Sequence, residues 1–256
     1  WKWTLTCFSI VLRLVLLWPL LIALGLAAVA EIAQCFWPEF SAGGHQKLGL
    51  TLEGIDPHRK VEELANRGIR VGDLLEFYAK LGKDVMPHFD PLASTTHDVV
   101  RQAVIPLSTG EEWPGGGAAY ATVVAGGEPR LAFKMVTHNW GNKFAHLLAA
   151  IFADCLGDRT YQDVLACLEG GPEALDKLRR KLAPKAKKTY WVCAFSVNQH
   201  AGICAKPPAK DSHGHDIVPC TCGVEKHWTG EECEMNKFDD MMAYLKVAVP
   251  GFSQVI

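Results

Sequence analysis

The chain has 256 residues, of which 49% are hydrophobic, and a formal net charge of −2. This length is sufficient for one compact domain beyond the N-terminal region. The nearly neutral charge excludes the strongly basic footprint of a nucleic-acid-binding protein. The main basic run, from Lys177 to Lys188, has no interleaved aromatic residues and indicates a solvated helix face or a contact with anionic lipid head groups. We therefore expect no nucleic-acid partner.

Residues 1–37 have the features of a single transmembrane helix. The stretch from Leu14 to Ala30 contains no charged residue, and its length suits a bilayer span. Arg13 precedes this stretch and can either snorkel toward the interface or pair with a partner subunit. Aromatic residues suited to membrane interfaces lie near both ends, namely Trp1, Trp3, Phe36 and Trp37.

These features predict a single-pass membrane protein whose helix docks against other subunits of a membrane complex, with pigment or lipid contacts along it. Two alternatives stay open. Ala28, Val29 and Ala30 precede Glu31 as a signal-peptide cleavage site would, and the apolar stretch also suits a buried core helix.

Beyond this helix we expect a linker and peripheral segment over residues 38–70 and a folded domain over residues 71–256. Apolar residues recur at helical spacing from Val71 to Leu81, and Gly82 ends the pattern. Thr95, Thr96 and Asp98 predict the capped start of a short helix that runs through Val104 and ends before Pro106.

The second half of the domain mixes predicted strands and helices. Residues 119–124 and 131–137, joined through Gly126 and Gly127, predict a β-hairpin. Helices are expected over residues 142–156, 161–168, 172–182 and 234–246, and a buried strand over 189–197. This order indicates an α+β or mixed α/β domain.

A Cys/His-rich loop, residues 200–233, predicts a metal site. It contains four cysteines and four histidines, and thiolate and imidazole groups are the preferred ligands of zinc. Cys220 and Cys222 can bind from one loop, and the i, i+4 pair His200 and Cys204 can supply further ligands. The candidate ligands are therefore His200, Cys204, Cys220, Cys222 and Cys233. A Cys204–Cys233 disulfide or free thiols are the alternatives.

No catalytic residue is assigned. His138 and Trp140 follow a predicted strand, and Asn198 and His200 end another, so these four side chains form a candidate pocket if they converge. Structural hydrogen bonding is the competing interpretation for each of them. Cys193 lies in an apolar run and is interpreted as a small core residue.

Three runs of sequence resemble an uncharacterised protein family of dinoflagellate algae. They are Thr-His-Asn-Trp-Gly at 137–141, Thr-Tyr-Trp-Val-Cys-Ala-Phe-Ser-Val-Asn-Gln-His-Ala at 189–201, and Cys-Glu-Met-Asn-Lys-Phe-Asp-Asp-Met-Met at 233–242. The strand that ends in Asn198 and Gln199 also resembles, more distantly, heterokaryon-incompatibility domains, which are related to the Toll/interleukin-receptor fold and sometimes cleave NAD. Trp191, Ala194, Asn198 and Gln199 match that motif, whereas Cys193 replaces its aspartate.

These features favour a non-catalytic accessory subunit of a large membrane complex, with one docked helix and a zinc-stabilised extramembrane domain. The dinoflagellate resemblance implies a plastid thylakoid location and a photosystem or light-harvesting supercomplex as host. The main alternative is a membrane-anchored enzyme or signalling domain that acts on a nucleotide such as NAD. A membrane-tethered metal-binding or redox protein is the third possibility.

Overall fold

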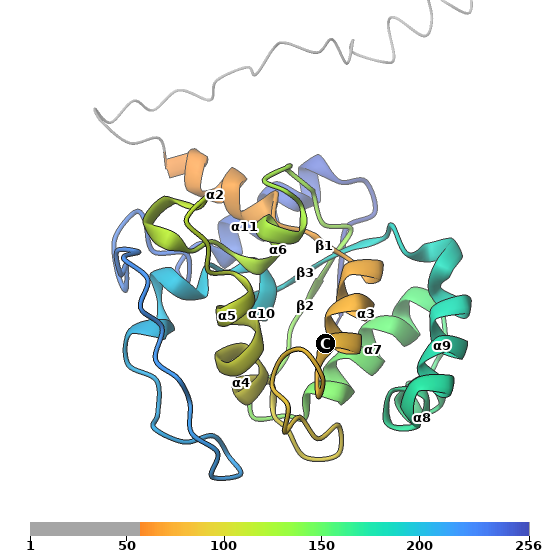
Figure 1. Cartoon of the computed structure of the whole chain (residues 1–256). Coiled ribbons are helices and arrows are strands. Elements are labelled where there is room, and N and C mark those ends of the chain that lie inside the picture. Colours follow the sequence, from red (N-terminus) through yellow and green to blue (C-terminus); the bar gives the residue numbers. More distant parts are fainter. Residues whose placement is uncertain (1–56, 256) are drawn as a thin grey trace, which may run out of the picture. The chain divides into compact units, whose positions relative to one another are not determined.

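A small mixed β-sheet forms the centre of the part of the chain that this computed structural model describes, residues 57–255 (Figure 1). The strands lie in the order β1-β3-β2-β4. β3 pairs antiparallel with β1 and parallel with β2, and β2 pairs parallel with β4. The strand bounds are Ile69–Arg70 for β1, Lys134–Val136 for β2, Thr189–Val192 for β3 and Ser253–Val255 for β4. The mixed α/β class predicted from the sequence is confirmed.

Helices account for most of the remaining regular structure. The α-helices are α2 (Pro57–Ala65), α3 (Val71–Lys80), α4 (Thr96–Val99), α5 (Ile105–Leu107), α6 (Tyr120–Val124), α7 (Phe144–Leu156), α8 (Gln162–Glu169), α9 (Gly171–Leu182), α10 (Cys193–Ser196) and α11 (Phe238–Ala248). A π-helical turn η1 (Val100–Val104) joins α4 to α5, and the 3-10 turns are η2 (Pro114–Gly116), η3 (Ala183–Lys185), η4 (Gln199–Ala201) and η5 (Ile203–Ala205).

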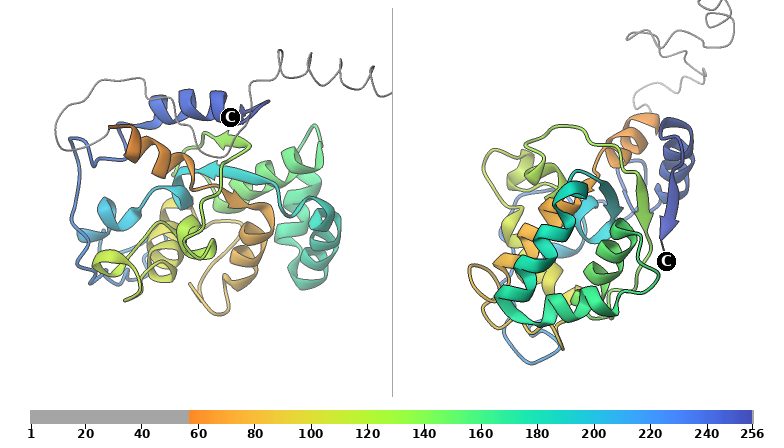
Figure 2. Two further views of the ribbon diagram at one scale, coloured as in Figure 1. Left: turned by 90° about the horizontal axis from the view of Figure 1, so that it is seen from above. Right: turned by 90° about the vertical axis from the view of Figure 1, so that its right-hand side faces the viewer.

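Helices cover both faces of the sheet, as the turned views show (Figure 2). Side chains alternate along β3, so Tyr190 and Val192 enter a larger core while Trp191 enters a smaller one. The smaller core is closed by α2 and α11, and the indole Nε1 of Trp191 donates a hydrogen bond to the Leu64 carbonyl at 2.9 Å. Both α2 and β1 lie in the segment predicted as a peripheral linker. They therefore extend the folded domain toward the N-terminus.

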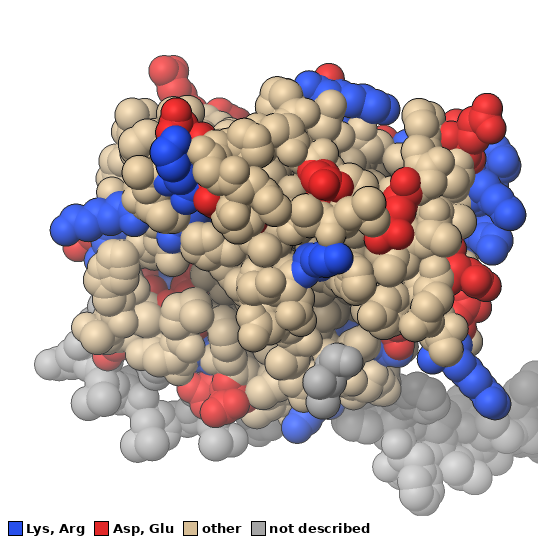
Figure 3. Space-filling view, turned by 90° about the horizontal axis from the view of Figure 1, so that it is seen from below, with Lys and Arg blue, Asp and Glu red and all other residues tan. Residues whose placement is uncertain are grey.

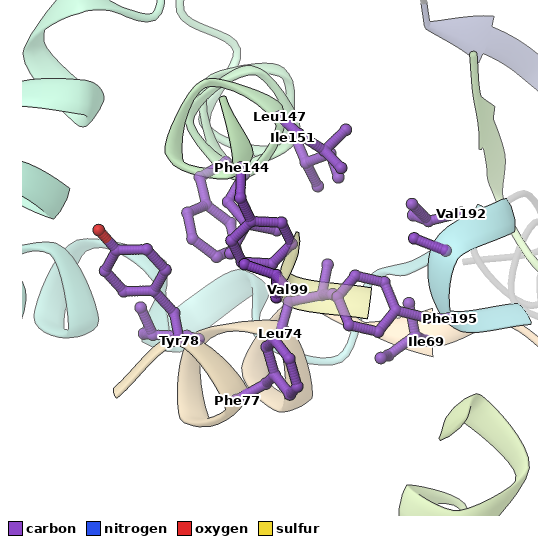
Figure 4. Packing of buried hydrophobic residues seen from close by; sticks show 14 of the residues in the cluster. Ile69, Leu74, Phe77, Tyr78, Val99, Phe144, Leu147, Ile151, Val192 and Phe195 are labelled. Atoms are coloured by element: carbon purple, nitrogen blue, oxygen red, sulfur yellow. The ribbon is translucent and has the colours of Figure 1, made fainter. Parts of the chain in front are cut away.

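Aromatic rings fill the larger core between α3, α7 and α10 (Figure 4). The ring of Phe77 lies at the centre, with centroid distances of 5.1 Å to Phe195 and 5.2 Å to Tyr120. Phe144 packs edge-on against Phe77 at 5.8 Å. These edge-to-face contacts lock α3, α7 and α10 around the end of the sheet.

The capped start of the short helix is confirmed. Thr95 Oγ1 accepts a hydrogen bond from the Asp98 amide at 3.2 Å, and Asp98 Oδ2 accepts one from the Thr95 amide at 2.9 Å. The helix does not end before Pro106 but continues through η1 to Leu107. Within this stretch the Ile105 amide bonds to the Val100 carbonyl, five residues back. Such π turns are rare and are frequently found at functional sites.

Thr95→Ala is expected to lower the free energy of unfolding by about 1 kcal/mol. The hydroxyl accepts a hydrogen bond from the Asp98 amide, which has no carbonyl partner within the helix. Urea denaturation measures this change. Thr95→Ser restores the oxygen and should recover most of the loss. Equal stability of the alanine and serine variants would show that the cap contributes nothing.

Two sequence predictions in the centre of the chain were wrong. Instead of the hairpin strand predicted over residues 119–124, the chain forms helix α6 over Tyr120–Val124. The buried Tyr120 ring packs on Phe77, and a short apolar run suits either element. The strand predicted over 189–197 ends at Val192, where its partner β2 also ends. The chain then turns into α10, and Ser196 Oγ accepts a hydrogen bond from the Val192 amide at 3.2 Å.

The predicted N-terminal helix, residues 1–37, lies outside the described residues. Within residues 57–255 no helix combines the length and the apolar character that crossing a membrane requires. On the face shown in Figure 3, acidic and basic side chains are interspersed around a largely uncharged centre.

Candidate metal centre

Four side chains of the Cys/His-rich loop converge, namely His200, Cys204, Cys220 and Cys222, here called the His/Cys cluster. One ligand atom from each lies within 4.8 Å of all the others. His200 is fully buried and Cys204 is nearly so, whereas Cys220 and Cys222 are half-buried. This arrangement confirms that the loop brings together groups able to hold a metal ion.

Two consecutive 3-10 turns place the first pair of ligands. Asn198 begins η4, and its side-chain oxygen accepts a hydrogen bond from the His200 amide at 3.1 Å. Cys204 follows in η5 with its thiol 3.4 Å from the His200 carbonyl. The second pair comes from an extended segment, which is anchored where the Gly223 amide donates to the Gly115 carbonyl at 2.8 Å.

The ligand atoms are spaced as separate donors. Cys204 Sγ lies 3.6 Å from Cys222 Sγ, and Cys220 Sγ lies 3.5 Å from His200 Nδ1. All seven cysteines between residues 57 and 255 are free, so the alternative Cys204–Cys233 disulfide is not formed. Distances of this size are those between ligands that share one tetrahedral ion.

A hydrogen bond on the far side of the imidazole orients His200. Ser108 Oγ donates to the Val104 carbonyl at 2.7 Å and lies 3.0 Å from His200 Nε2. Because the Ser108 hydroxyl proton is used in the bond to the Val104 carbonyl, His200 Nε2–H is the donor to Ser108 Oγ. This tautomer leaves the Nδ1 lone pair directed at the cysteines, as a metal-binding histidine requires.

Gly117 makes room for the imidazole. A Cβ atom at this position would lie 2.5 Å from His200 Cγ, closer than real Cβ contacts. Gly117 has a φ of −170°, which is extended backbone that any residue adopts. The glycine is therefore needed for space and not for its conformational freedom.

The electrostatics of the His/Cys cluster suit a divalent cation. Burial lowers the pKa of His200, and the charge of Lys226 lowers it further, so the imidazole is neutral. Burial and the neighbouring thiols raise the pKa of Cys204 to about 12. Three thiols held this closely cannot all ionise without compensation, and a bound cation supplies it. Lys226 Nζ lies 3.9 Å from Cys222 Sγ and adds a positive charge.

Cys233 does not join the His/Cys cluster, although it was a predicted ligand. Its side chain is buried elsewhere, next to Glu234, which faces Arg67. Sequence spacing alone did not distinguish Cys233 from the other three cysteines.

The four residues of the candidate pocket lie in three different surroundings. Asn198 lines a cleft of about 710 Å³, His200 belongs to the His/Cys cluster, and His138 and Trp140 lie beside Cys193. Neither His138 nor Trp140 lines the cleft. The convergence that a catalytic pocket would require is absent from these four positions.

Cys193 has polar neighbours that its apolar sequence context did not reveal. Trp140 Nε1 donates a hydrogen bond to its thiol at 3.2 Å, and His138 Nε2 lies 3.8 Å from it. Burial raises the pKa of the Cys193 thiol, which disfavours the nucleophilic thiolate. The arrangement therefore serves packing better than thiol chemistry.

His138 should make stability depend on pH, because burial lowers the pKa of its imidazole below the ordinary value of about 6.5. Its contribution is complete above that pH and is lost as acidification forces a proton onto the buried ring. Relative to His138→Asn, the wild-type free energy of unfolding should fall as pH decreases below about 6.5. Urea denaturation across this range measures the difference, and parallel curves would contradict it.

The cleft contains an ion-pair network that sequence reasoning missed. Arg67 Nη1 donates to Glu234 Oε1 at 2.7 Å and to the Ser196 carbonyl at 3.2 Å, and Nη2 pairs with Glu63. Glu234 Oε2 accepts a hydrogen bond from the Asn198 amide at 2.8 Å. The network ties the segment before β1 to the segments on both sides of the His/Cys cluster.

No protein-family model, curated protein or solved structure matches this chain. Function is therefore inferred from the geometry of the described residues.

Proposed function

We propose that this chain is a non-catalytic accessory subunit of a membrane complex and that its domain is stabilised by one zinc ion in the His/Cys cluster. The completeness of the ligand set carries the proposal. A tetrahedral ion bound by these three cysteines and one histidine would have all four positions occupied by protein atoms. Structural zinc sites have such closed spheres, whereas catalytic sites keep a position for water or substrate.

Zinc is the metal that this ligand set favours. Thiolates select zinc, copper(I) or iron–sulfur clusters over magnesium or calcium, and a mixed Cys/His set at tetrahedral spacing is typical of structural zinc. Three thiolates and one Zn²⁺ leave a net charge of −1, which the nearby Lys226 ammonium offsets.

The zinc would fasten the Cys/His-rich loop to the helical body. His200 and Cys204 follow α10, whereas Cys220 and Cys222 lie beyond a stretch with few regular elements. One ion bridging the two pairs closes that stretch into a loop and orders it. A loop ordered in this way would present a fixed surface for contact with other subunits. The uncharged run from Leu14 to Ala30 supports membrane docking, and the dinoflagellate resemblance supports a thylakoid photosystem or light-harvesting complex as host.

The test is to purify the full chain from its native membrane in mild detergent and identify co-purifying proteins and metals by mass spectrometry. We expect zinc in the preparation and stoichiometric recovery with a large membrane assembly. Recovery of the chain without partners would overturn the accessory role.

The metal assignment is tested separately with recombinant full chain. Cys222→Ser should remove one zinc per chain, and Cys167→Ser, which changes a cysteine outside the cluster, should remove none. Equal zinc content in both variants would overturn the zinc assignment whatever the partners are.

A further inference from the structure

A second group of side chains that could hold a metal ion joins the loop after η5 to the segment between α3 and α4. His88 comes from the segment between α3 and α4, and Asp211 and His215 come from the loop of residues 206–237. One ligand atom from each of these three, here called the His/Asp cluster, lies within 4.8 Å of the others. In Figure 1 both segments extend to the lower side of the molecule.

Asp211 is the centre of the His/Asp cluster. Its Oδ1 accepts hydrogen bonds from the amides of His213 and His215, both at 2.9 Å. Its Oδ2 faces three nitrogen atoms: Gln102 Nε2 at 3.0 Å, His215 Nδ1 at 3.1 Å and His88 Nε2 at 3.2 Å. A side chain with no exposed surface thus directs one carboxylate oxygen at two imidazoles.

The two imidazoles compete for the same oxygen. His88 Nε2 is buried and, although close to Oδ2, lacks the alignment of a hydrogen bond. The rings stack at a centroid distance of 3.9 Å and an angle of 27°, with His88 Nε2 and His215 Nδ1 both close to Asp211 Oδ2. A metal ion bound to both ring nitrogens and to Oδ2 removes this conflict, because each neutral imidazole then contributes a lone pair.

The surroundings supply the support that a metal-binding carboxylate needs. Gln102 belongs to the π-helical turn η1 and holds Oδ2 from outside the cluster. Burial alone would raise the pKa of Asp211, but the hydrogen bonds from Gln102 and from the His215 and His213 amides hold it well below its usual range. Ser212 also fixes the loop by donating from its hydroxyl to Asp98 Oδ2 at 2.6 Å.

We propose that His88, Asp211 and His215 form a second metal site, independent of the His/Cys cluster, that binds a divalent cation of the zinc type. Two imidazoles and one carboxylate are a ligand set for zinc and for other first-row divalent ions. His215 is 46% exposed at its side chain, so water can complete the coordination sphere. The second ion would join the stretch between Cys204 and Cys220 to the segment after α3, while the first would join Cys204 to Cys220 and Cys222.

The test uses recombinant full chain titrated with Zn²⁺ and, separately, with Co²⁺ as a spectroscopic probe. Wild type should bind two ions per chain. His88→Gln and His215→Gln should each weaken the second ion at least about tenfold while keeping the thiolate-to-cobalt charge-transfer absorption of the first site. That retained absorption shows that each variant is folded.

Two further variants separate this proposal from the zinc assignment of the His/Cys cluster. Cys222→Ser should lose the thiolate absorption and keep one ion bound by nitrogen and oxygen ligands. His213→Gln changes an exposed neighbour outside the cluster and should keep both ions. Binding of a single ion by wild type with full thiolate absorption, or unchanged affinity in both glutamine variants, would overturn the second site and leave the first intact.

Discussion

Replacing Cys222 with serine is expected to lower the free energy of unfolding by several kcal/mol, on the order of 4 kcal/mol, in the presence of excess zinc. The hydroxyl of serine is a poor zinc ligand, and the ion binds the folded state much more tightly than the unfolded chain. The loss should therefore greatly exceed that expected for removing a half-buried thiol. Urea denaturation with free zinc held constant measures it.

Chelation supplies the control for this experiment. With EDTA present, wild type and Cys222→Ser should differ by less than about 1 kcal/mol, because neither then gains binding energy from the ion. Cys167→Ser should match wild type with and without zinc. An effect of Cys222→Ser that persists unchanged in EDTA would show that the thiol stabilises the fold without a metal.

Arg67→Met is expected to cost about 3–5 kcal/mol, because it leaves a buried carboxylate without its partner. The side chains of Arg67 and Glu234 are only 8% and 6% exposed, and Nη1 also serves the Ser196 carbonyl. Methionine has a comparable apolar length, so the cost arises from lost charge pairing and not from a cavity. Chemical denaturation of the variant measures this loss.

Arg179→Met is the matched control, because the pairs of Arg179 with Glu76 and Asp176 lie at the surface. Its cost should stay below about 1 kcal/mol. Replacing Glu234 by leucine together with Arg67→Met should recover much of the stability by removing both charges. Equal effects of Arg67→Met and Arg179→Met would show that burial does not strengthen the Arg67 network.

Long periodic patterns predicted the helices well, because such patterns need only local sequence. Helix α7 spans Phe144–Leu156 against a prediction of 142–156, and α9 spans Gly171–Leu182 against 172–182. Short apolar runs failed. Residues 119–124 satisfy strand and helix patterns alike, and only the contact of Tyr120 with Phe77 decides between them.

The part of the site that could be predicted is the part made by residues close in sequence. His200, Cys204, Cys220 and Cys222 lie close enough in sequence to indicate a shared ion. Cys233 belongs to the same run by spacing, but its position depends on how the chain returns toward Arg67. The His/Asp cluster joins His88 to residues of a distant loop, and the pairing of Arg67 with Glu234 likewise depends on tertiary structure. Neither could be found before the fold was known.

The space that Gly117 leaves for His200 means that substitutions at these two positions, which are far apart in the chain, depend on each other. While the imidazole occupies that space, any side chain at position 117 would collide with it. If a smaller residue replaces His200 in a descendant of this protein, the steric clash disappears and larger residues are tolerated at position 117. A residue larger than glycine at position 117 should therefore occur only in descendants that have replaced His200.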